Sequence, residues 1–540
     1  MSPPRSPFDR SASLARLAGD SFDVLVIGGG ITGAGVALDA AARGLRTALV
    51  ERRDLASGTS SRSSKLVHGG LRYLQQRELR LVYESLAERQ RLLSNAPHLV
   101  QPLPFLIPLL GRDGMVNAAL ARTVQTALWT YDLTGGLRIG HRHRRVGAEE
   151  ALAHLPTLRT DRLVAGFVYY DAHTDDARLT LAVARTAALD HGAVVATYAP
   201  VTGLLRDAAG RVAGARVEPE GGRPVDVGAS VVVNATGVWA DRVEALAGGA
   251  PTSSPGGIRP AKGIHIAVPA DRLPCDMAAV VPVPGDKRSV FVVPWGGQVY
   301  IGTTDTDYQG PLDDPRATAG DVAYVLGAVN AAVTRALSPA DVSGVWAGLR
   351  PLLAASAGAT SARTADLSRR HRVGESPSGL ISITGGKLTT YRKMAADTVD
   401  LAIRRLGRSP RRSPTASLRL RGWAGTAELR QPGAAERLGT DPVTLAHLVD
   451  RHGGEAGAVL ELARSAPEMG RPLVEGLPYV AAEAVYAARH EMAHTLIDIL
   501  SRRTRALLRD RVATARAAPA VAALVAPELG WDGDESRRQA

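Results

Sequence analysis

Residues 22–51 constrain the fold more than any other part of this chain. An apolar run over residues 22–27 leads into the turn Gly28-Gly29-Gly30-Ile31-Thr32-Gly33, which an alanine-rich segment and a second apolar run follow. This order predicts strand, glycine turn, helix, strand and a terminal acid, the fingerprint of a dinucleotide site. The glycines allow the tight bend, the close approach of a pyrophosphate and the packing of helix on strand. The sequence therefore predicts an α/β domain that binds a dinucleotide.

The identity of the dinucleotide depends on Glu51 and on two distant segments. Glu51 ends the second strand, where it would accept hydrogen bonds from a ribose hydroxyl and repel the 2′-phosphate of an NADP-type ligand. Residues 231–239 and 381–390 each read as a buried strand that ends in a small-residue turn. A nicotinamide domain is normally one contiguous unit, whereas a longer flavin dinucleotide gathers contacts from separated segments. FAD is therefore favoured over NAD.

Composition limits the setting of this chain. Its 540 residues are 45% apolar and 22% charged, which is typical of a globular protein of two or three domains. Lys and Arg outnumber Asp and Glu by 12, a balance that suits an anionic substrate, an acidic membrane surface or nucleic acid, or reflects a general arginine bias. Cys275 is the single cysteine, so neither an internal disulfide nor a cysteine-rich metal site is possible. We find no 18-residue apolar run and therefore expect a soluble or peripheral protein.

The alternation of strand-like and helical patterns predicts an α/β fold with a second, all-α domain. The expected architecture is a Rossmann-like FAD-binding domain with an interleaved, mainly antiparallel substrate-binding sheet, followed by C-terminal helices. The predicted strands cover residues 166–170, 193–198, 229–233, 264–268, 290–294 and 299–302, and the predicted helices residues 73–95, 321–337 and 388–406. The predicted divisions are a flexible arm (1–20), the FAD-binding domain (21–405) with its interleaved cap (about 76–155 and 260–345), a linker (406–414), the helical domain (415–530) and a tail (531–540).

The motifs of this chain resemble those of the FAD-dependent glycerol-3-phosphate dehydrogenases of the aerobic, quinone-linked type. The resemblance runs from Asp23 to about Arg505, and residues 63–74 carry the part that is specific to the family rather than to the fold. Its other carriers are residues 27–35, 59–62, 175–179, 262–265, 301–305 and 385–392. The resemblance implies that sn-glycerol 3-phosphate is oxidised to dihydroxyacetone phosphate, with hydride transfer to FAD and electron transfer to a membrane quinone.

Such a substrate needs cations for its phosphate and a base for its alcohol. Arg72, Arg350 and Lys387 match family positions around the substrate, and a guanidinium can grip two phosphate oxygens. His68 and His265 are candidates for the base, because an imidazole that titrates near neutrality can take the alcohol proton. In strand register His265 faces away from its two isoleucine neighbours, towards a polar pocket. The sequence does not decide between the two histidines.

The candidate FAD contacts come from the glycine turn, Glu51, the polar loop that follows it and the two distant turns. They are Gly28, Gly29, Gly30, Thr32, Gly33, Glu51, Arg52, Thr59, Ser60, Ser61, Ser64, Lys65, Leu66, His68, Gly70, Val201, Ala235, Thr236, Gly237, Trp239, Gly386, Lys387, Leu388 and Thr389. The serines of the polar loop could equally be turn formers.

One motif points elsewhere. His490-Glu491-Met492-Ala493-His494 has the HExxH spacing of zinc proteases and falls in a predicted helix. No third ligand stands at a familiar distance, and the segment continues into what resembles the ordinary C-terminal helix of the family. We therefore expect no metal site.

The electron acceptor and the location are the least constrained. A quinone acceptor implies a cytoplasmic protein that docks at the inner face of the cell membrane, and residues 115–133 could form an interfacial helix with the apolar residues Val116, Leu120, Val124, Leu128 and Tyr131. Packing of that helix on the protein's own core is the alternative. A homodimer is compatible with the pattern, and no nucleic acid partner is expected. The rival functions are an oxidase that uses oxygen, an amine or amino-acid oxidising flavoprotein of the same fold, and a flavin-containing nucleic-acid binder without turnover.

Overall fold

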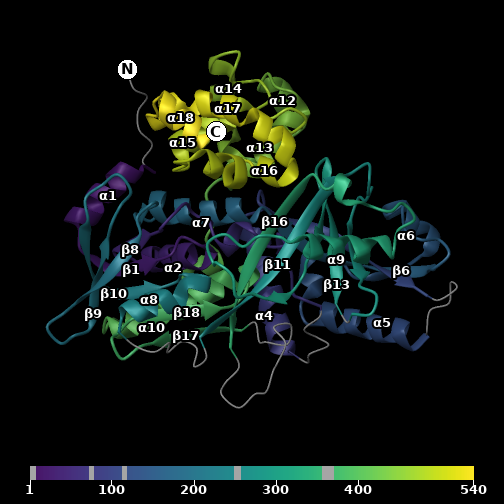
Figure 1. Ribbon diagram of the computed structural model, residues 1–540. Coiled ribbons are helices and arrows are strands. Elements are labelled where there is room, and N and C mark those ends of the chain that lie inside the picture. The colour runs from purple at the N-terminus through teal and green to yellow at the C-terminus, as the bar shows by residue number, and fades with distance from the viewer. Residues whose placement is uncertain (1–7, 72–77, 112–117, 249–256, 287, 355–369) are drawn as a thin grey trace.

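The computed structural model describes residues 8–71, 78–111, 118–248, 257–286, 288–354 and 370–540. Over these residues the chain forms a mixed α/β body around two sheets, and a helical domain made by the end of the chain sits on that body (Figure 1). The arrangement confirms the predicted fold class.

The first sheet is the predicted dinucleotide-binding sheet. Its described strands run in the order β17-β18-β10-β1-β2-β7, parallel except for β17, and the antiparallel hairpin β8–β9 continues from β10. β1 is buried along its whole length, as expected for a parallel strand with helices on both faces. The strand bounds are β1 (Phe22–Ile27), β2 (Thr47–Val50), β7 (Val194–Ala196), β8 (Val201–Arg206), β9 (Val212–Val217), β10 (Val225–Asn234), β17 (His371–Glu375) and β18 (Ile381–Gly385).

Two layers cover this sheet. Val24 and Val26 of β1 share a core with α2 (Ile31–Ala42), α7 (Asp176–Leu189) and α10 (Tyr391–Arg405). Leu25 and Ile27 point the other way, towards α1 (Arg10–Gly19), the β8–β9 hairpin and α8 (Ala240–Leu246). The α2 N-terminus consequently lies at the carboxyl end of β1, which is where doubly wound sheets bind their ligands.

The second sheet confirms the predicted antiparallel insertion. Its described strands follow the order β15-β11-β14-β13-β12-β4-β6-β3, with β16 on β11 and β5 on β6, and β12 with β4 is the parallel pair in this order. The bounds are β3 (Leu66–Val67), β4 (Val100–Leu110), β5 (Arg144–Gly147), β6 (Leu163–Thr174), β11 (Ile258–Pro269), β12 (Ala278–Pro282), β13 (Ser289–Trp295), β14 (Gln298–Gly302), β15 (Thr306–Asp307) and β16 (Gly344–Leu353). One face packs on α6 (Ala148–His154) and α9 (Ala319–Asn330), and the other on α4 (Leu79–Asn95) and α5 (Ala118–Leu133).

The end of the chain folds into the predicted helical domain. Its elements are α11 (Thr426–Leu429), α12 (Ala434–Arg437), α13 (Pro442–His452), α14 (Ala456–Ser465), α15 (Ala481–His490), η9 (Asp498–Arg503), α16 (Ala506–Arg509), α17 (Arg511–Leu529) and α18 (Gly533–Gln539). α17 is long and apolar enough to span a membrane, contrary to our expectation that no segment would be. Its residues Val521, Ala522 and Val525 are buried in the core of the helical domain, so that part of the helix packs on protein.

Several expected boundaries are wrong for identifiable reasons. Residues 10–19 of the expected flexible arm form α1, because the Arg10 guanidinium donates to the carbonyl oxygens of Thr197 and Tyr198 and Leu17 is buried. The expected tail contains α18. α9 ends at Asn330 rather than at residue 337. The side-chain amide of Asn330 donates a hydrogen bond to the backbone carbonyl of Leu337 and accepts one from its backbone N–H, and these two bonds close a turn. The described part of the helix predicted over residues 73–95 begins at Leu79.

The HExxH segment is not one helix. α15 ends at His490, and Met492 has a left-handed backbone with φ of 55°. Glu491 is buried and accepts two hydrogen bonds from Arg178, at 2.7 and 2.8 Å. No group of three potential ligands from His, Cys, Asp and Glu occurs among the residues that the structure describes.

Candidate active site

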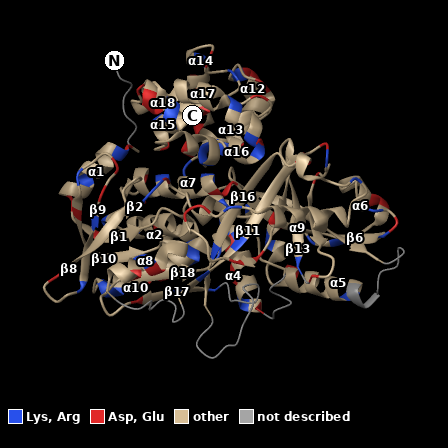
Figure 2. Cartoon of the chain, viewed as in Figure 1, with Lys and Arg blue, Asp and Glu red and all other residues tan. Residues whose placement is uncertain are grey.

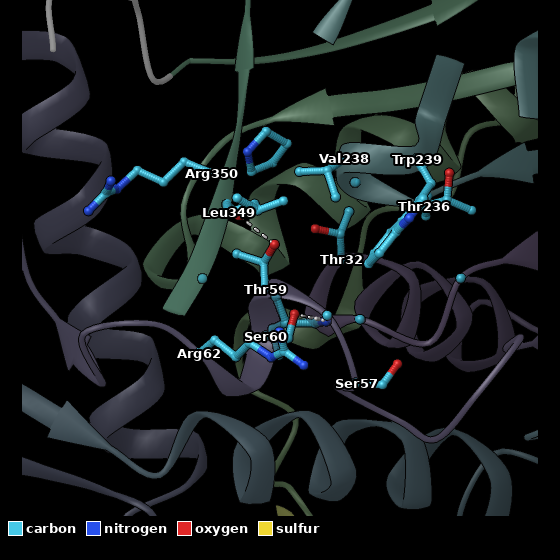
Figure 3. A pocket seen from close by; sticks show the side chains of 18 of the residues that line it. Thr32, Ser57, Thr59, Ser60, Arg62, Thr236, Val238, Trp239, Leu349 and Arg350 are labelled. Carbon is cyan, nitrogen blue, oxygen red and sulfur yellow. Dashed lines mark hydrogen bonds between the residues drawn. The ribbon is translucent and has the colours of Figure 1, made fainter. Parts of the chain in front are cut away.

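A cavity of about 490 Å³ opens between the glycine turn of the first sheet and the facing strands of the second. Its walls come from segments that are far apart in the sequence, including η1 (Thr59–Ser61), η3 (Gly237–Trp239), β16 and the β18 end that leads into η6 (Leu388–Thr390). Figure 3 shows one such junction, where the Thr59 hydroxyl donates to the Leu349 carbonyl at 2.6 Å. The polar loop is thereby fixed to the second sheet.

Most of the predicted cofactor residues line this cavity. They are Gly28, Gly30, Thr32, Glu51, Arg52, Thr59, Ser60, Ser64, Leu66, His68, Val201, Ala235, Thr236, Gly237, Trp239, Gly386, Lys387, Leu388 and Thr389. Gly29, Gly33, Ser61, Lys65 and Gly70 do not belong to the lining.

The residues outside the lining support it from behind. The Gly29 N–H donates to Glu51, and a Cβ at Gly33 would lie 1.8 Å from the Gly28 carbonyl oxygen. Lys65 points away from the cavity, and its ammonium donates to Asp176 at 3.2 Å. Burial, followed by the charge of Arg505, lowers the pKa of Lys65 to about 8, against the opposing effect of Asp176.

The glycine turn has the geometry that a pyrophosphate needs. Gly28 has φ of +113°, and a Cβ there would come within 2.8 Å of the Ala235 carbonyl oxygen. The Ile31 N–H at the start of α2 donates to Ser60 at 2.9 Å, so the helix N-terminus opens into the cavity beside the polar loop. A helix N-terminus of this kind favours an anion. The residues present therefore fit a dinucleotide such as FAD.

Glu51 also holds the turn itself. Its carboxylate accepts the Gly29 N–H at 2.6 Å and the Arg53 N–H at 2.9 Å. Burial raises the pKa of Glu51, and these two hydrogen bonds oppose the shift. Glu51 therefore has a structural role that the sequence did not reveal, and its role as ribose acceptor stays a prediction.

Two of the three predicted phosphate-binding cations line the same cavity. Arg350 follows Leu349 on β16, and in Figure 3 its side chain extends away from Leu349 and Thr59. Its guanidinium donates to Thr303 at 3.1 Å and to the Thr304 carbonyl at 3.2 Å. Lys387 directly precedes η6, and its ammonium donates to Ser85 of α4 at 3.2 Å. Arg72 lies outside the described residues.

His265 occupies a tightly shaped place in the wall. Its Nε2 lies 2.9 Å from the Ser64 hydroxyl, and its ring stacks on Trp346 with centroids 5.0 Å apart. Burial lowers the pKa of His265 well below its usual value, and the cations of Lys65 and Arg350 add to the effect. A Cβ at Gly302 on the neighbouring strand would lie 2.2 Å from the imidazole, so that position has room only for glycine.

The register prediction for His265 is confirmed. Ile264 and Ile266 belong to the core on the other face of the sheet, whereas His265 lines the cavity. His68 lines the cavity as well. Its backbone N–H donates to the Thr389 hydroxyl at 3.2 Å, and its ring packs edge-on against Phe291.

Asp313 is a lining residue that the sequence analysis missed. It follows β15, and its carboxylate accepts the Trp239 indole N–H at 2.8 Å and a guanidinium N–H of Arg52 at 2.5 Å. Asp313 thereby joins the second sheet to two residues of the dinucleotide side. No local pattern marks such a residue, since its partners are remote in the sequence, although its position in a proline-flanked acidic loop was a weak signal.

Comparisons with known proteins agree with this geometry. A family described as FAD dependent oxidoreductase matches residues 23–392, and the C-terminal domain of alpha-glycerophosphate oxidase matches residues 413–536. Glycerol-3-phosphate dehydrogenase 2 of Mycobacterium tuberculosis is 44% identical over 542 residues, which cover 99% of this chain and 89% of the relative. The mitochondrial glycerol-3-phosphate dehydrogenase of Mesocricetus auratus is 38% identical over 99% of this chain and 74% of its own length.

A solved structure is similar over the whole chain. The glycerol-3-phosphate dehydrogenase of Bacillus halodurans, complexed with FAD, superimposes with a TM-score of 0.79 at 32% identity and covers 99% of this chain and 96% of its own. The match extends over both sheets and the helical domain. The chain described here therefore belongs to the family of FAD-dependent glycerol-3-phosphate dehydrogenases.

Proposed function

We propose that this protein oxidises sn-glycerol 3-phosphate to dihydroxyacetone phosphate and passes the electrons through FAD to a membrane quinone. The observation that carries the proposal is convergence: His68, His265, Arg350 and Lys387 line the same cavity as the glycine turn. FAD, when bound, supplies an acceptor for the hydride that leaves the secondary carbon of the substrate. The protein itself supplies binding, orientation and proton transfer.

Arg350 and Lys387 would bind the substrate phosphate. Arg350 presents a planar fork that can bridge two phosphate oxygens, and the contacts to Thr303 and Thr304 hold that fork in place. Lys387 adds a point charge from the segment between β18 and η6. Plain glycerol lacks the anion that these groups would bind.

A neutral imidazole would take the proton of the substrate alcohol. Burial and the cations of Lys65 and Arg350 lower the pKa of His265 and so favour its neutral ring, the form that can accept a proton. Its Nε2 lies beside the hydroxyl of Ser64, which also lines the cavity. His68 lines the cavity as well and is the second candidate.

An exposed apolar face supports docking on a membrane. Of the two alternatives for residues 115–133, the burial of Leu128 and Tyr131 in the protein's own core favours packing over an interfacial helix that uses these residues. Other apolar side chains are exposed on α4, α5 and η2 (Gly136–Ile139) instead. This α4–α5 face consists of Leu79, Tyr83, Trp129, Leu133 and Leu137.

Arginine side chains lie beside the apolar residues of the α4–α5 face. The Arg138 guanidinium lies 5.0 Å from the Tyr83 ring, and that of Arg142 lies 5.5 Å from the Trp129 ring. Apolar side chains mixed with arginines are typical of surfaces that lie on anionic lipid. This favours attachment at the inner face of the cell membrane, where a quinone acceptor is within reach.

One anaerobic titration tests the proposal. Glycerol 3-phosphate should bleach the flavin absorbance of the holoenzyme, whereas glycerol and glycine should not; bleaching by glycine would favour the amino-acid oxidising alternative. Readmission of air or of a soluble quinone analogue then separates the acceptors. Hydrogen peroxide formed in air as fast as quinone is reduced would replace the quinone assignment with an oxidase.

A further inference from the structure

The C-terminal helical domain contributes no residue to the described cavity lining, yet several of its arginines form ion pairs with the body that carries the cavity, and three of these lie close together in sequence, at Arg502, Arg503 and Arg505. Arg502 and Arg503 both donate to the buried carboxylate of Asp54. Arg505 donates to the carbonyl of Ser61 at 2.8 Å and to the carboxylate of Asp176. Figure 2 shows basic residues along the border where α16 faces α7.

Arg505 is part of a buried cluster behind the polar loop. Its side chain is 0% exposed, and so is that of Asp176. The second carboxylate oxygen of Asp176 accepts the N–H and the hydroxyl of Ser63, at 3.0 and 2.7 Å. Arg505 and Asp176 together therefore fix residues 61–63 from the side away from the cavity.

The same cluster reaches His265 along two routes. In the first, Ser64 follows the fixed segment directly, and its hydroxyl bonds the imidazole. In the second, Lys65 binds Asp176 and places its ammonium 4.9 Å from the ring of Trp346, the residue that stacks on His265. Residues 61–65 thus supply the hydrogen bond of this histidine through Ser64 and contact its stacking partner through Lys65.

We propose that Arg505 is a positioning residue for the cavity, and that the helical domain acts on the active site through the Arg505–Asp176–Lys65 cluster. The assignment explains why a domain that does not line the cavity is joined to the oxidoreductase body by buried ion pairs. As far as it concerns catalysis, it rests on the proposed function, since it assumes that His265 takes part in substrate oxidation.

The test compares Arg505→Ala and Arg505→Lys with Arg489→Ala in the full-length, FAD-loaded protein. Arg489 is the control for the loss of an ion pair, because it forms a two-bond pair with Glu528 inside the helical domain, at 2.7 and 2.5 Å, at a more exposed position than Arg505. An effect that comes only from losing an arginine–carboxylate pair of this domain would appear in both variants. The readouts are the rate of flavin bleaching by glycerol 3-phosphate, the half-saturating substrate concentration, and the visible spectrum and release rate of FAD without substrate.

We expect Arg505→Ala to slow bleaching by about tenfold to a hundredfold, the effect of a small misplacement of reacting groups. The half-saturating concentration should change by less than about threefold, because Arg350 and Lys387 are untouched. Arg505→Lys should recover part of the rate, and Arg489→Ala should leave it within about twofold of the parent. Lys65→Met combined with Arg505→Ala should be little slower than the slower single variant, because both act through one segment.

Opposite results would overturn the proposal. The first such result is that Arg505→Ala folds, binds FAD and bleaches at the parental rate. The second is that Arg489→Ala slows bleaching as much as Arg505→Ala does. Either result would show that Arg505 does not position the site. If Arg505→Ala does not fold, parental rates in both Arg505→Lys and Lys65→Met would overturn it equally.

A failure of the proposed function is distinguishable from a failure of this inference. If glycerol 3-phosphate does not bleach the flavin of the parent protein, the proposed function fails. The visible spectrum and the FAD release rate, both measured without substrate, then decide whether Arg505 has a positioning role. Arg505→Ala should then still shift the flavin absorbance band and release FAD faster than Arg489→Ala does. If Arg505→Ala changes neither the flavin spectrum nor the FAD release rate, the positioning role of Arg505 is excluded.

Discussion

At the residue scale, Arg350 is held in place by the protein itself. Thr303, the Thr304 carbonyl and the carboxylate of Asp305 surround its guanidinium, with the Asp305 oxygen at 3.4 Å. Arg350→Gln should raise the KM for glycerol 3-phosphate by about tenfold to a hundredfold, the worth of a hydrogen-bonded charge, while FAD remains bound. Steady-state kinetics with a flavin assay measure both quantities.

Arg216 provides the control for this substitution. It lies at the surface, pairs with Asp226 across the β9–β10 hairpin and does not line the cavity. Arg216→Gln should leave the KM unchanged. An Arg350→Gln enzyme with the parental KM would remove Arg350 from the phosphate site.

Buried histidines should make the protein less stable in mild acid. Burial and nearby arginines lower the pKa of His98 and of His452 to about 4, whereas the unfolded chain titrates near 6.5. Between these values the unfolded state binds more protons than the folded state, so the free energy of unfolding falls as the pH falls. Each such group contributes about 1.4 kcal/mol per pH unit in this window.

The histidine contribution can be measured by denaturant unfolding at pH 7, 6 and 5. His452 accepts a hydrogen bond from Arg178 in its neutral form, and His452→Gln should flatten the decline in unfolding free energy. His154→Gln, at a more exposed position, serves as the control for the substitution itself. A His452→Gln slope equal to that of the parent would refute the assignment.

At the scale of elements, the glycine turn depends on how closely α2 approaches β1. A Cβ at Gly33 would collide with the Gly28 carbonyl oxygen, whereas Gly327, also inside a helix, has open space around it. Gly33→Ala should therefore abolish FAD retention, because the turn must move. Gly327→Ala should stabilise α9 by up to about 1 kcal/mol through its higher helix propensity. Flavin content after gel filtration and thermal unfolding distinguish the two; retention of FAD by Gly33→Ala would show that the turn tolerates displacement.

Elements with a strong local pattern could be predicted from the sequence. β1, α2 and β2 follow from apolar runs around a glycine turn, and the face of His265 follows from the two-residue period of β11. The end of α9 could not be predicted, since the Asn330 amide and not a helix breaker closes it. The break after His490 depends on Arg178, which binds Glu491 from a helix more than 300 positions earlier in the chain.

The candidate site likewise has residues that the sequence could predict and residues that it could not. Its glycines and Glu51 carry a local signature, whereas Asp313, Ser85 and Arg505 act through partners that only the folded chain brings near. Lys65 illustrates the consequence. It lies within a family-specific run and was therefore predicted to touch the cofactor, but the buried carboxylate of Asp176 holds it on the other side of the loop.

At the scale of the whole molecule, the cavity lies between the two sheets, and the helical domain packs on the body without lining it, so the α4–α5 face remains available at the periphery. In Figure 1, α4 and α5 lie on the side of the body away from the helical domain. A protein docked by this face would hold the second sheet near the lipid and the helical domain away from it. The α4–α5 face, and not the apolar helix α17, is accordingly the expected membrane contact.

This orientation predicts a selective loss of lipid binding. Leu133 of that face and Val443 of α13 in the helical domain are both 75% exposed, so their replacement by serine removes apolar surface of similar exposure at two places. Leu133→Ser combined with Tyr83→Ser should reduce flotation with vesicles of phosphatidylglycerol and phosphatidylcholine, and Val443→Ser should not. Bleaching by glycerol 3-phosphate in solution should be unchanged in all variants, because none of the three residues lines the cavity. Equal flotation of the double variant and the parent would place the membrane contact elsewhere. If flotation of the parent persists at high salt, insertion of apolar side chains contributes more to lipid binding than the charges of the arginines at this surface.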